Sequence, residues 1–228
     1  EQVARLFHKK FYHYRGRIHE QVYKKDDSTH NYYPIPVTLN HQGYSVTKDT
    51  QEKALRNLKL LLMDLAEDGE DPYTCFQIGQ SYRILNDLDN ALLYYDKALS
   101  MEVEPELEYV QTMVEMYGYC LLEKGNLEAA LQLENVYDEF SKRADFVFLM
   151  GLIYMNAALF DRAIEQFEKA TYIKNCATVG TNSFLAWYNA GVICEVLGLT
   201  KEAYDYYHKC GDYTPAVKQL TNLTPDNK

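Results

Sequence analysis

Apolar side chains recur with a helical period through most of the chain. In four stretches between residues 86 and 210 they stand three or four positions apart, which is the spacing of one helix face. In each repeat a glycine stands twelve residues before an alanine. From one repeat to the next, both the glycines and the alanines are 39, 33 and 40 residues apart. The glycines are Gly79, Gly118, Gly151 and Gly191, and the alanines are Ala91, Ala130, Ala163 and Ala203. We therefore predict four helix pairs in residues 71–211.

The residues around each glycine and alanine resemble the tetratricopeptide repeat. The first copy carries Tyr82 and Tyr95 at the large positions of that motif, and the fourth adds Trp187 in its aromatic position. The small residues allow two helices to approach closely, and the large ones fill the space beside them. The resemblance implies a mainly all-α chain whose repeats stack into an α-solenoid.

The second repeat departs from the motif. Glu134 and Tyr137 stand where phenylalanine and alanine are usual, so we expect a real but distorted helix pair. The two longer steps between repeats predict insertions near residues 100–108 and 174–183.

Helices are also predicted on both sides of the repeats. Residues 47–70 form a linker helix, in which Asp49 and Glu52 resemble a capping box. Five leucines are expected on its buried face: Leu55, Leu58, Leu61, Leu62 and Leu65. Residues 212–228 are expected to form a capping helix and a tail.

The first 46 residues follow a different period. Alternating apolar and polar positions predict short strands within residues 17–23 and 35–41. Two strands cannot bury a core alone. We therefore interpret residues 1–46 as the end of an α/β domain, and the start at Glu1 suggests a piece of a longer protein.

The motifs in this region are similar to the end of the catalytic domain of bacterial family 2 glycosyltransferases of the GT-A type. They are Arg5-Leu6-Phe7, Tyr14 to Glu20, His41-Gln42-Gly43-Tyr44, and Lys53 with Arg56-Asn57. The resemblance covers roughly residues 1–65 and implies a parent enzyme that uses a nucleotide-sugar donor and a divalent metal, Mn²⁺ or Mg²⁺. The chain has no D-x-D motif at the expected place, because Asp87-Leu88-Asp89 lies in a turn between repeat helices. The fragment alone is therefore expected to be inactive.

Three residues of the N-terminal region are candidates for the chemistry of such a parent. His41 is a candidate auxiliary metal ligand, and its alternative role is a hydrogen-bonded histidine at a strand end. His19 and Glu20 are weak catalytic candidates, because neighbours on a strand point to opposite faces. For Glu20 the alternative is a salt bridge with a nearby arginine or lysine.

The first helices of the repeats are expected to line a partner-binding groove. Its predicted residues are Tyr73, Phe76, Gln80, Phe148, Leu185 and Tyr188. Aromatic side chains at these positions suit an apolar peptide or a sugar ring. The alternative is that they only pack one repeat against the next.

The charge of the chain limits the kinds of partner that we expect, and its cysteine content indicates the cellular compartment. The net charge is −10, with 11 Lys/Arg against 6 Asp/Glu in residues 1–59 and 12 against 27 in residues 60–228. The acidic part disfavours nucleic acid and favours a neutral or basic partner. Five widely spaced cysteines indicate reduced thiols in a cytoplasmic protein. We predict neither a membrane span nor a signal peptide.

Two functions remain open from these patterns. The first is the region of a bacterial glycosyltransferase that binds a protein, peptide or glycan acceptor. The second is a stand-alone tetratricopeptide scaffold for protein interactions. Self-association into a homo-oligomer is compatible with both.

Overall fold

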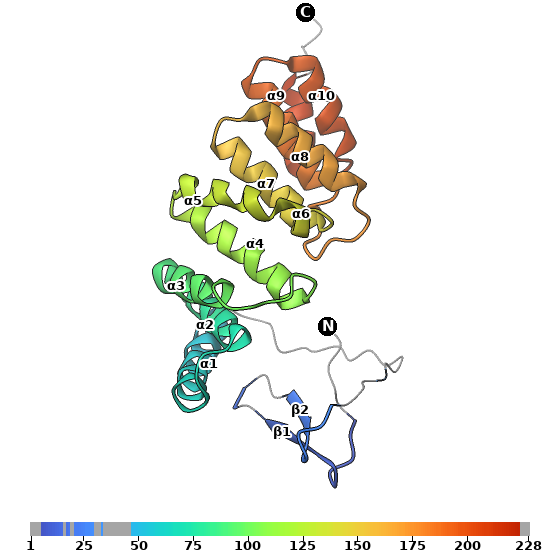
Figure 1. Cartoon of the computed structure of the whole chain (residues 1–228). Helices are drawn as coiled ribbons and strands as arrows, with labels where there is room; N and C mark the ends of the chain where they lie inside the picture. The colour runs from blue at the N-terminus through green and yellow to red at the C-terminus, as the bar shows by residue number, and fades with distance from the viewer. Residues whose placement is uncertain (1–5, 16, 19–20, 30–32, 34–46, 224–228) are drawn as a thin grey trace, which may run out of the picture. The chain divides into compact units, whose positions relative to one another are not determined.

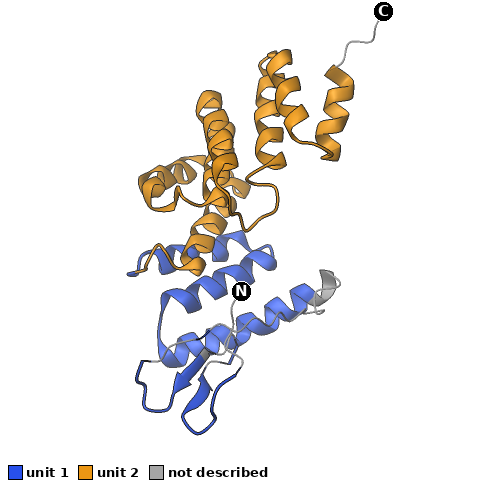
Figure 2. Cartoon of the chain, turned by 90° about the vertical axis from the view of Figure 1, so that its right-hand side faces the viewer, with its two compact units in different colours: residues 1–102 blue, residues 103–228 orange. Residues whose placement is uncertain are grey.

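The computed structural model describes residues 6–15, 17–18, 21–29, 33 and 47–223. The chain divides into two compact units, residues 1–102 and 103–228, which are coloured separately in Figure 2. Each unit is described by itself below. Figure 1 gives the labels of the helices and strands.

Unit 1 begins with a β-hairpin. Strands β1 (Tyr12–Arg15) and β2 (Gln21–Lys24) are antiparallel, and Tyr14 stands opposite the buried Val22. The strand predicted in residues 17–23 is confirmed only from residue 21, and β1 was not predicted. The strand predicted in residues 35–41 lies outside the described residues.

Helix α1 (Thr47–Asp68) confirms the predicted linker helix. Leu58 and Leu61 are buried and pack with Ile78 of the following helix. The prediction was wrong for Leu55, which is 61% exposed, because the buried face is turned so that it includes Ala54 instead.

The first helix pair consists of α2 (Pro72–Ile84) and α3 (Leu88–Leu99). Both helices are capped by aspartate, since Asp71 accepts from the Thr74 amide at 3.0 Å and Asp87 from the Asn90 amide at 3.2 Å. A Cβ atom on Gly79 would lie 2.6 Å from the Tyr95 ring, so only glycine allows this approach. Asp87 therefore caps a helix, as the turn position of Asp87-Leu88-Asp89 predicts.

Unit 2 begins with the distorted pair. Helix α4 (Glu108–Glu123) is continuous, but its partner is divided into α5 (Leu127–Leu131), the 3₁₀ helix η1 (Gln132–Val136) and α6 (Tyr137–Phe140). The predicted distortion is confirmed, and the break begins at Gln132, two residues before Glu134.

The rest of unit 2 is a regular array. Its elements are α7 (Ala144–Asn156), α8 (Phe160–Tyr172), α9 (Phe184–Val196), α10 (Thr200–Lys209) and α11 (Thr214–Leu223). From α7 onward each helix contacts the next in chain order, and α4 also contacts α7. This nearest-neighbour packing is that of an α-solenoid.

The same close contact recurs within the regular pairs of unit 2. A Cβ atom would lie 2.6 Å from the Phe167 ring if placed on Gly151, and 2.7 Å from the Tyr207 ring if placed on Gly191. Both rings are fully buried. The core of each pair is therefore an aromatic ring of the second helix that lies against a glycine of the first.

Candidate protein-interaction surface

The predicted catalytic and metal-binding residues cannot be placed. His19, Glu20 and His41 all lie outside the described residues, so their roles stay predictions. Within the described part of the chain, no three His, Cys, Asp or Glu side chains gather closely enough to hold a metal ion. Nearby, Arg17 binds Asp64 and Glu67 of α1 and thereby ties the hairpin region to that helix.

In unit 1, α2 carries three of the predicted groove residues. Phe76 is 5% exposed, and its ring lies against the rings of Tyr73 and Tyr95. Gln80 accepts a hydrogen bond from the Tyr95 hydroxyl at 2.9 Å. Tyr73 is half-buried. Phe76 and Gln80 therefore position Tyr95, while Tyr73 keeps a surface that a partner can reach.

In unit 2, the other three predicted residues lie on α7 and α9. Phe148 is buried against Phe167, with ring centroids 5.4 Å apart. Leu185 and Tyr188 are half-buried on α9. The Tyr188 ring contacts the rings of Tyr207 and Tyr213, at centroid distances of 5.6 and 5.4 Å. Both side chains are therefore partly exposed, and Tyr188 also packs on aromatic rings.

The predicted insertion at residues 174–183 is an ordered loop. The buried carboxylate of Asp145, on α7, accepts from the backbone amides of Ala177 and Thr178 at 2.7 and 2.8 Å. It also accepts from the Thr181 hydroxyl at 3.2 Å. This role of Asp145 was not predicted from the sequence, because its partners lie more than thirty residues away and no local pattern connects them.

A second buried carboxylate joins the distorted pair to α7. Glu115 on α4 forms an ion pair with Arg143, which also donates to Gln111 at 3.0 Å. Burial raises the pKa of the Glu115 carboxyl to about 7, although the bond to Arg143 acts in the opposite direction. The ion pair of Glu115 with Arg143 was not predicted from the sequence either.

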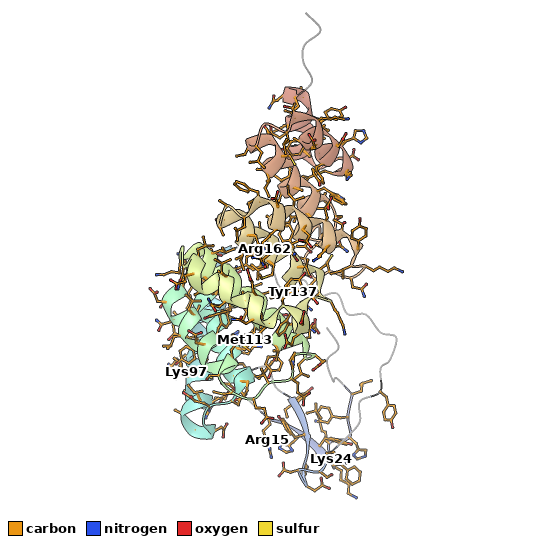
Figure 3. The ribbon with its side chains drawn as sticks, turned by 45° about the horizontal axis from the view of Figure 1, so that its top comes forward. Arg15, Lys24, Lys97, Met113, Tyr137 and Arg162 are labelled. Carbon is orange, nitrogen blue, oxygen red and sulfur yellow. The ribbon has the colours of Figure 1, made fainter. Side chains whose placement is uncertain are left out.

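Polar contacts hold the distorted segment against α8. Arg162 and Tyr137, both labelled in Figure 3, lie at this junction. Arg162 pairs with Glu134 at 3.0 Å, and the Tyr137 hydroxyl donates to Gln166. Arg162 also donates to the Tyr154 hydroxyl, whose pKa burial raises to about 12. Glu134 therefore binds at the surface, where a phenylalanine at this position of the motif would enter the core.

The described surface suits non-covalent binding. In unit 1 it offers half-buried Tyr73, which contacts the buried Phe76. In unit 2 it offers half-buried Leu185 and Tyr188, of which Tyr188 contacts the buried Tyr207. Rigid rings of this kind lose little conformational entropy when they contact a partner. The arrangement can therefore hold an apolar segment of another molecule.

Comparison with known sequences identifies two of the helix pairs. Residues 72–102 and 144–175 match the tetratricopeptide repeat. These segments contain α2 with α3 and α7 with α8, which are pairs with a glycine against an aromatic ring. These two segments are therefore tetratricopeptide repeats, as the residue pattern predicted for the first and third pairs. No curated protein sequence matches the chain significantly.

Several solved structures share the fold. MamA from Desulfovibrio magneticus RS-1 (residues 41 to the end) is 20% identical, with a TM-score of 0.58 over 78% of this chain and 95% of that one. YrrB, described as a tetratricopeptide-repeat protein with an unusual peptide-binding site, is 21% identical, with a TM-score of 0.60 over 75% and 84%. TTC0263 from Thermus thermophilus is 16% identical, with a TM-score of 0.52 over 78% and 98%.

At these identities the neighbours establish the fold and no more. The fold that they share with this chain is a stack of helix pairs, an α-solenoid. In the part of the chain that the structure describes, none of the helices is both long and apolar enough to cross a bilayer.

Proposed function

We propose that this tetratricopeptide-repeat chain is a scaffold that binds an extended segment of a partner protein on the first helices of its repeats. The observation that carries the proposal is the contact of the glycine with an aromatic ring in the three regular helix pairs. Gly79 with Tyr95, and Gly191 with Tyr207, hold the second helix against one side of the first. Half-buried side chains supply the binding contacts of each unit by itself: Tyr73 in unit 1, and Leu185 with Tyr188 in unit 2. The unusual peptide-binding site described for YrrB supports this type of partner.

Charge defines the chemistry of the partner segment. Residues 60–228 carry 12 Lys/Arg against 27 Asp/Glu, so an acidic segment would be repelled on approach. Tyr73 and Leu185 favour apolar side chains in the segment. We therefore expect a neutral or basic peptide with aliphatic or aromatic anchors.

A selection experiment tests the proposal. Peptides selected from a random library on the full chain are expected to be neutral or basic and to contain apolar anchors. Tyr73→Ala should weaken a selected peptide that binds unit 1 roughly tenfold, and Leu185→Ala should do the same for one that binds unit 2, measured by fluorescence anisotropy.

Matched variants on second helices provide the controls. Tyr204→Ala on α10 and Leu93→Ala on α3 also remove exposed apolar side chains, but from the opposite members of the pairs. They should leave the affinity unchanged. Equal losses at first and second helices, or a library that yields no specific binder, would refute the proposal.

A narrower proposal concerns a longer parent protein. The motifs within residues 1–65 support a family 2 glycosyltransferase whose repeats bind the acceptor, with a nucleotide-sugar donor and Mn²⁺ or Mg²⁺. The described residues hold no candidate metal site, and none of the three neighbours above is named as a glycosyltransferase. This proposal therefore rests on the sequence motifs alone.

Turnover of nucleotide sugars by the longer protein, with and without EDTA, tests the narrower proposal. We expect metal-dependent turnover that His41→Ala reduces, and no turnover by residues 1–228 alone. A parent without turnover on any donor would end the glycosyltransferase hypothesis and leave the scaffold proposal intact.

A further inference from the structure

A lysine of unit 2 lies over two neighbouring aromatic rings. Trp187 on α9 and Tyr206 on α10 are stacked, with ring centroids 5.9 Å apart and an angle of 23° between the planes. The Lys209 ammonium nitrogen lies 4.5 Å from the Trp187 centroid and 4.8 Å from the Tyr206 centroid. Both distances are within the range of cation–π attraction. This contact differs from those of Lys97 and Arg162, each of which lies over one tyrosine ring.

A third helix fixes the orientation of the tyrosine. The Tyr206 hydroxyl donates a hydrogen bond to Glu168 of α8, at 2.8 Å. Burial, together with this carboxylate, raises the pKa of the Tyr206 hydroxyl, so the group remains a neutral donor. Donation to a carboxylate increases the electron density of the ring, which strengthens its attraction for a cation. The three helices thus build a rigid, electron-rich surface.

Among the described residues, the Lys209 ammonium group contacts the two rings and forms no ion pair. Its side chain is exposed, and among the described residues no carboxylate lies within ion-pair distance of it. Lys209 is the last residue of α10, so its long side chain can move into solvent without disturbing the helix. An ammonium group from another molecule would meet the same two ring faces. The unit around it carries 10 Lys/Arg against 18 Asp/Glu, which favours a cationic ligand.

We propose that Trp187 and Tyr206 form a binding site for an ammonium group, either a lysine side chain of a partner or a small quaternary ammonium compound, which replaces Lys209. The site uses other contacts than Tyr188 does, because Trp187 packs on Tyr206 while Tyr188 packs on Tyr207 and Tyr213. It is therefore independent of the peptide-binding proposal, and either one can fail alone.

The test uses the fact that Trp187 is the one tryptophan of the sequence, so its fluorescence reports on this site directly. The full chain and its Lys209→Gln variant are titrated with tetramethylammonium and with an Nα-acetyl-lysine amide. The ligand controls are sodium chloride at equal ionic strength and 3,3-dimethyl-1-butanol, whose tert-butyl group is the neutral isostere of a trimethylammonium group. We expect saturable quenching by at least one cation, roughly fivefold tighter in Lys209→Gln because the internal competitor is gone.

Further variants separate the site from general charge effects. Lys201→Gln removes an exposed lysine from the same helix and should behave as the wild type. Tyr206→Leu in the Lys209→Gln background should abolish the response, with circular dichroism used to confirm that the variant is folded. If only tetramethylammonium binds, the ligand is a small quaternary compound; if the lysine amide also binds, it is a side chain of a partner.

Three results would overturn the proposal. One is a response to the neutral isostere equal to that of the cations. Another is the absence of saturable quenching in Lys209→Gln. The third is quenching in a folded Tyr206→Leu variant equal to that of its parent. Trp187→Phe followed by calorimetric titration with the same cations provides a check that does not use fluorescence and should retain weaker binding.

Discussion

The second and third helix pairs start from the same small residue and reach different structures. Gly151 of α7 lies against the buried ring of Phe167, and α8 is a continuous helix. Gly118 of α4 lies instead against Leu133 and Leu149, and its partner is broken into α5, η1 and α6. Leu149 belongs to the next pair, so α4 packs directly on α7.

The difference shows that glycine permits close packing but does not specify it. The ring of the second helix must fill the space beside the glycine. In the second pair that position is Glu134, whose carboxylate binds Arg162 at the surface. Without an inward-pointing ring, the backbone continues as a 3₁₀ helix, and the ion pair of Glu115 with Arg143 joins α4 to the start of α7.

Removing the aromatic ring of Phe167 should have the largest effect on stability. Phe167→Ala deletes a fully buried aromatic side chain and should lower the free energy of unfolding by about 3–5 kcal/mol. Glu134→Ala, at the equivalent position of the second pair, should cost less than about 1 kcal/mol because it removes an exposed ion pair. Urea denaturation followed by circular dichroism measures both. Similar losses of unfolding free energy in the two variants would contradict our conclusion that the buried ring contributes more to its pair than Glu134 does.

The ion pair of the second repeat should make stability depend on pH. The pKa of Glu115 is about 7 in the folded chain, against an ordinary value of 4.5, so the folded state binds this proton more tightly than the unfolded state. The stability contributed by Glu115 is therefore greatest below pH 4.5 and falls, by up to about 3 kcal/mol, as the pH rises to 7.

The Glu115→Gln variant isolates this effect. The difference in unfolding free energy between wild type and variant should fall between pH 4.5 and 7 in urea titrations. Glu108→Gln removes an exposed carboxylate from the same helix and serves as the control. A constant difference for Glu115→Gln across this range would show that the carboxylate titrates alike in both states.

Adding one methyl group to each glycine sharpens the comparison. A Cβ atom on residue 151 would lie 2.6 Å from the rigid Phe167 ring, so Gly151→Ala should destabilise the chain by about 1–3 kcal/mol. On residue 118 the nearest atoms are leucine methyl groups, which can rotate away, so Gly118→Ala should stay within about 1 kcal/mol of the wild type. Thermal unfolding distinguishes the two, and a larger loss at residue 118 would reverse our interpretation.

Substitutions at the helix N-caps should have the smallest effect on stability. Asn126 caps α5 by accepting from the Ala129 amide at 3.3 Å, whereas Leu159 stands at the N-cap of α8 without a side-chain cap bond. The two residues have nearly the same backbone angles. Leu159→Asp should therefore stabilise the chain by about 1 kcal/mol, and Asn126→Ala should destabilise it by a similar amount. A loss of stability in Leu159→Asp would show that this leucine contributes by packing.

The sequence predicted what depends on local pattern. The helix pairs, the distortion at Glu134 and the capping role of Asp87 all follow from residue types at fixed spacing. Leu55 was misplaced because its spacing fits both faces of α1, and only contact with α2 decides which face is buried. Asp145 and Glu115 act through partners about thirty residues away, so no local period reveals them. The contact of Lys209 with Trp187 likewise depends on the tertiary placement of α9 and α10.

Hydrogen exchange of the full chain, with and without a selected peptide, tests most directly the claim that the repeats bind a partner on their first helices. We predict that a peptide bound to unit 1 slows amide exchange in α2, that one bound to unit 2 slows it in α9, and that α3 and α10 stay nearly unchanged. Protection confined to α3 and α10, or exchange rates unaltered by a peptide that is shown to be bound, would contradict the account.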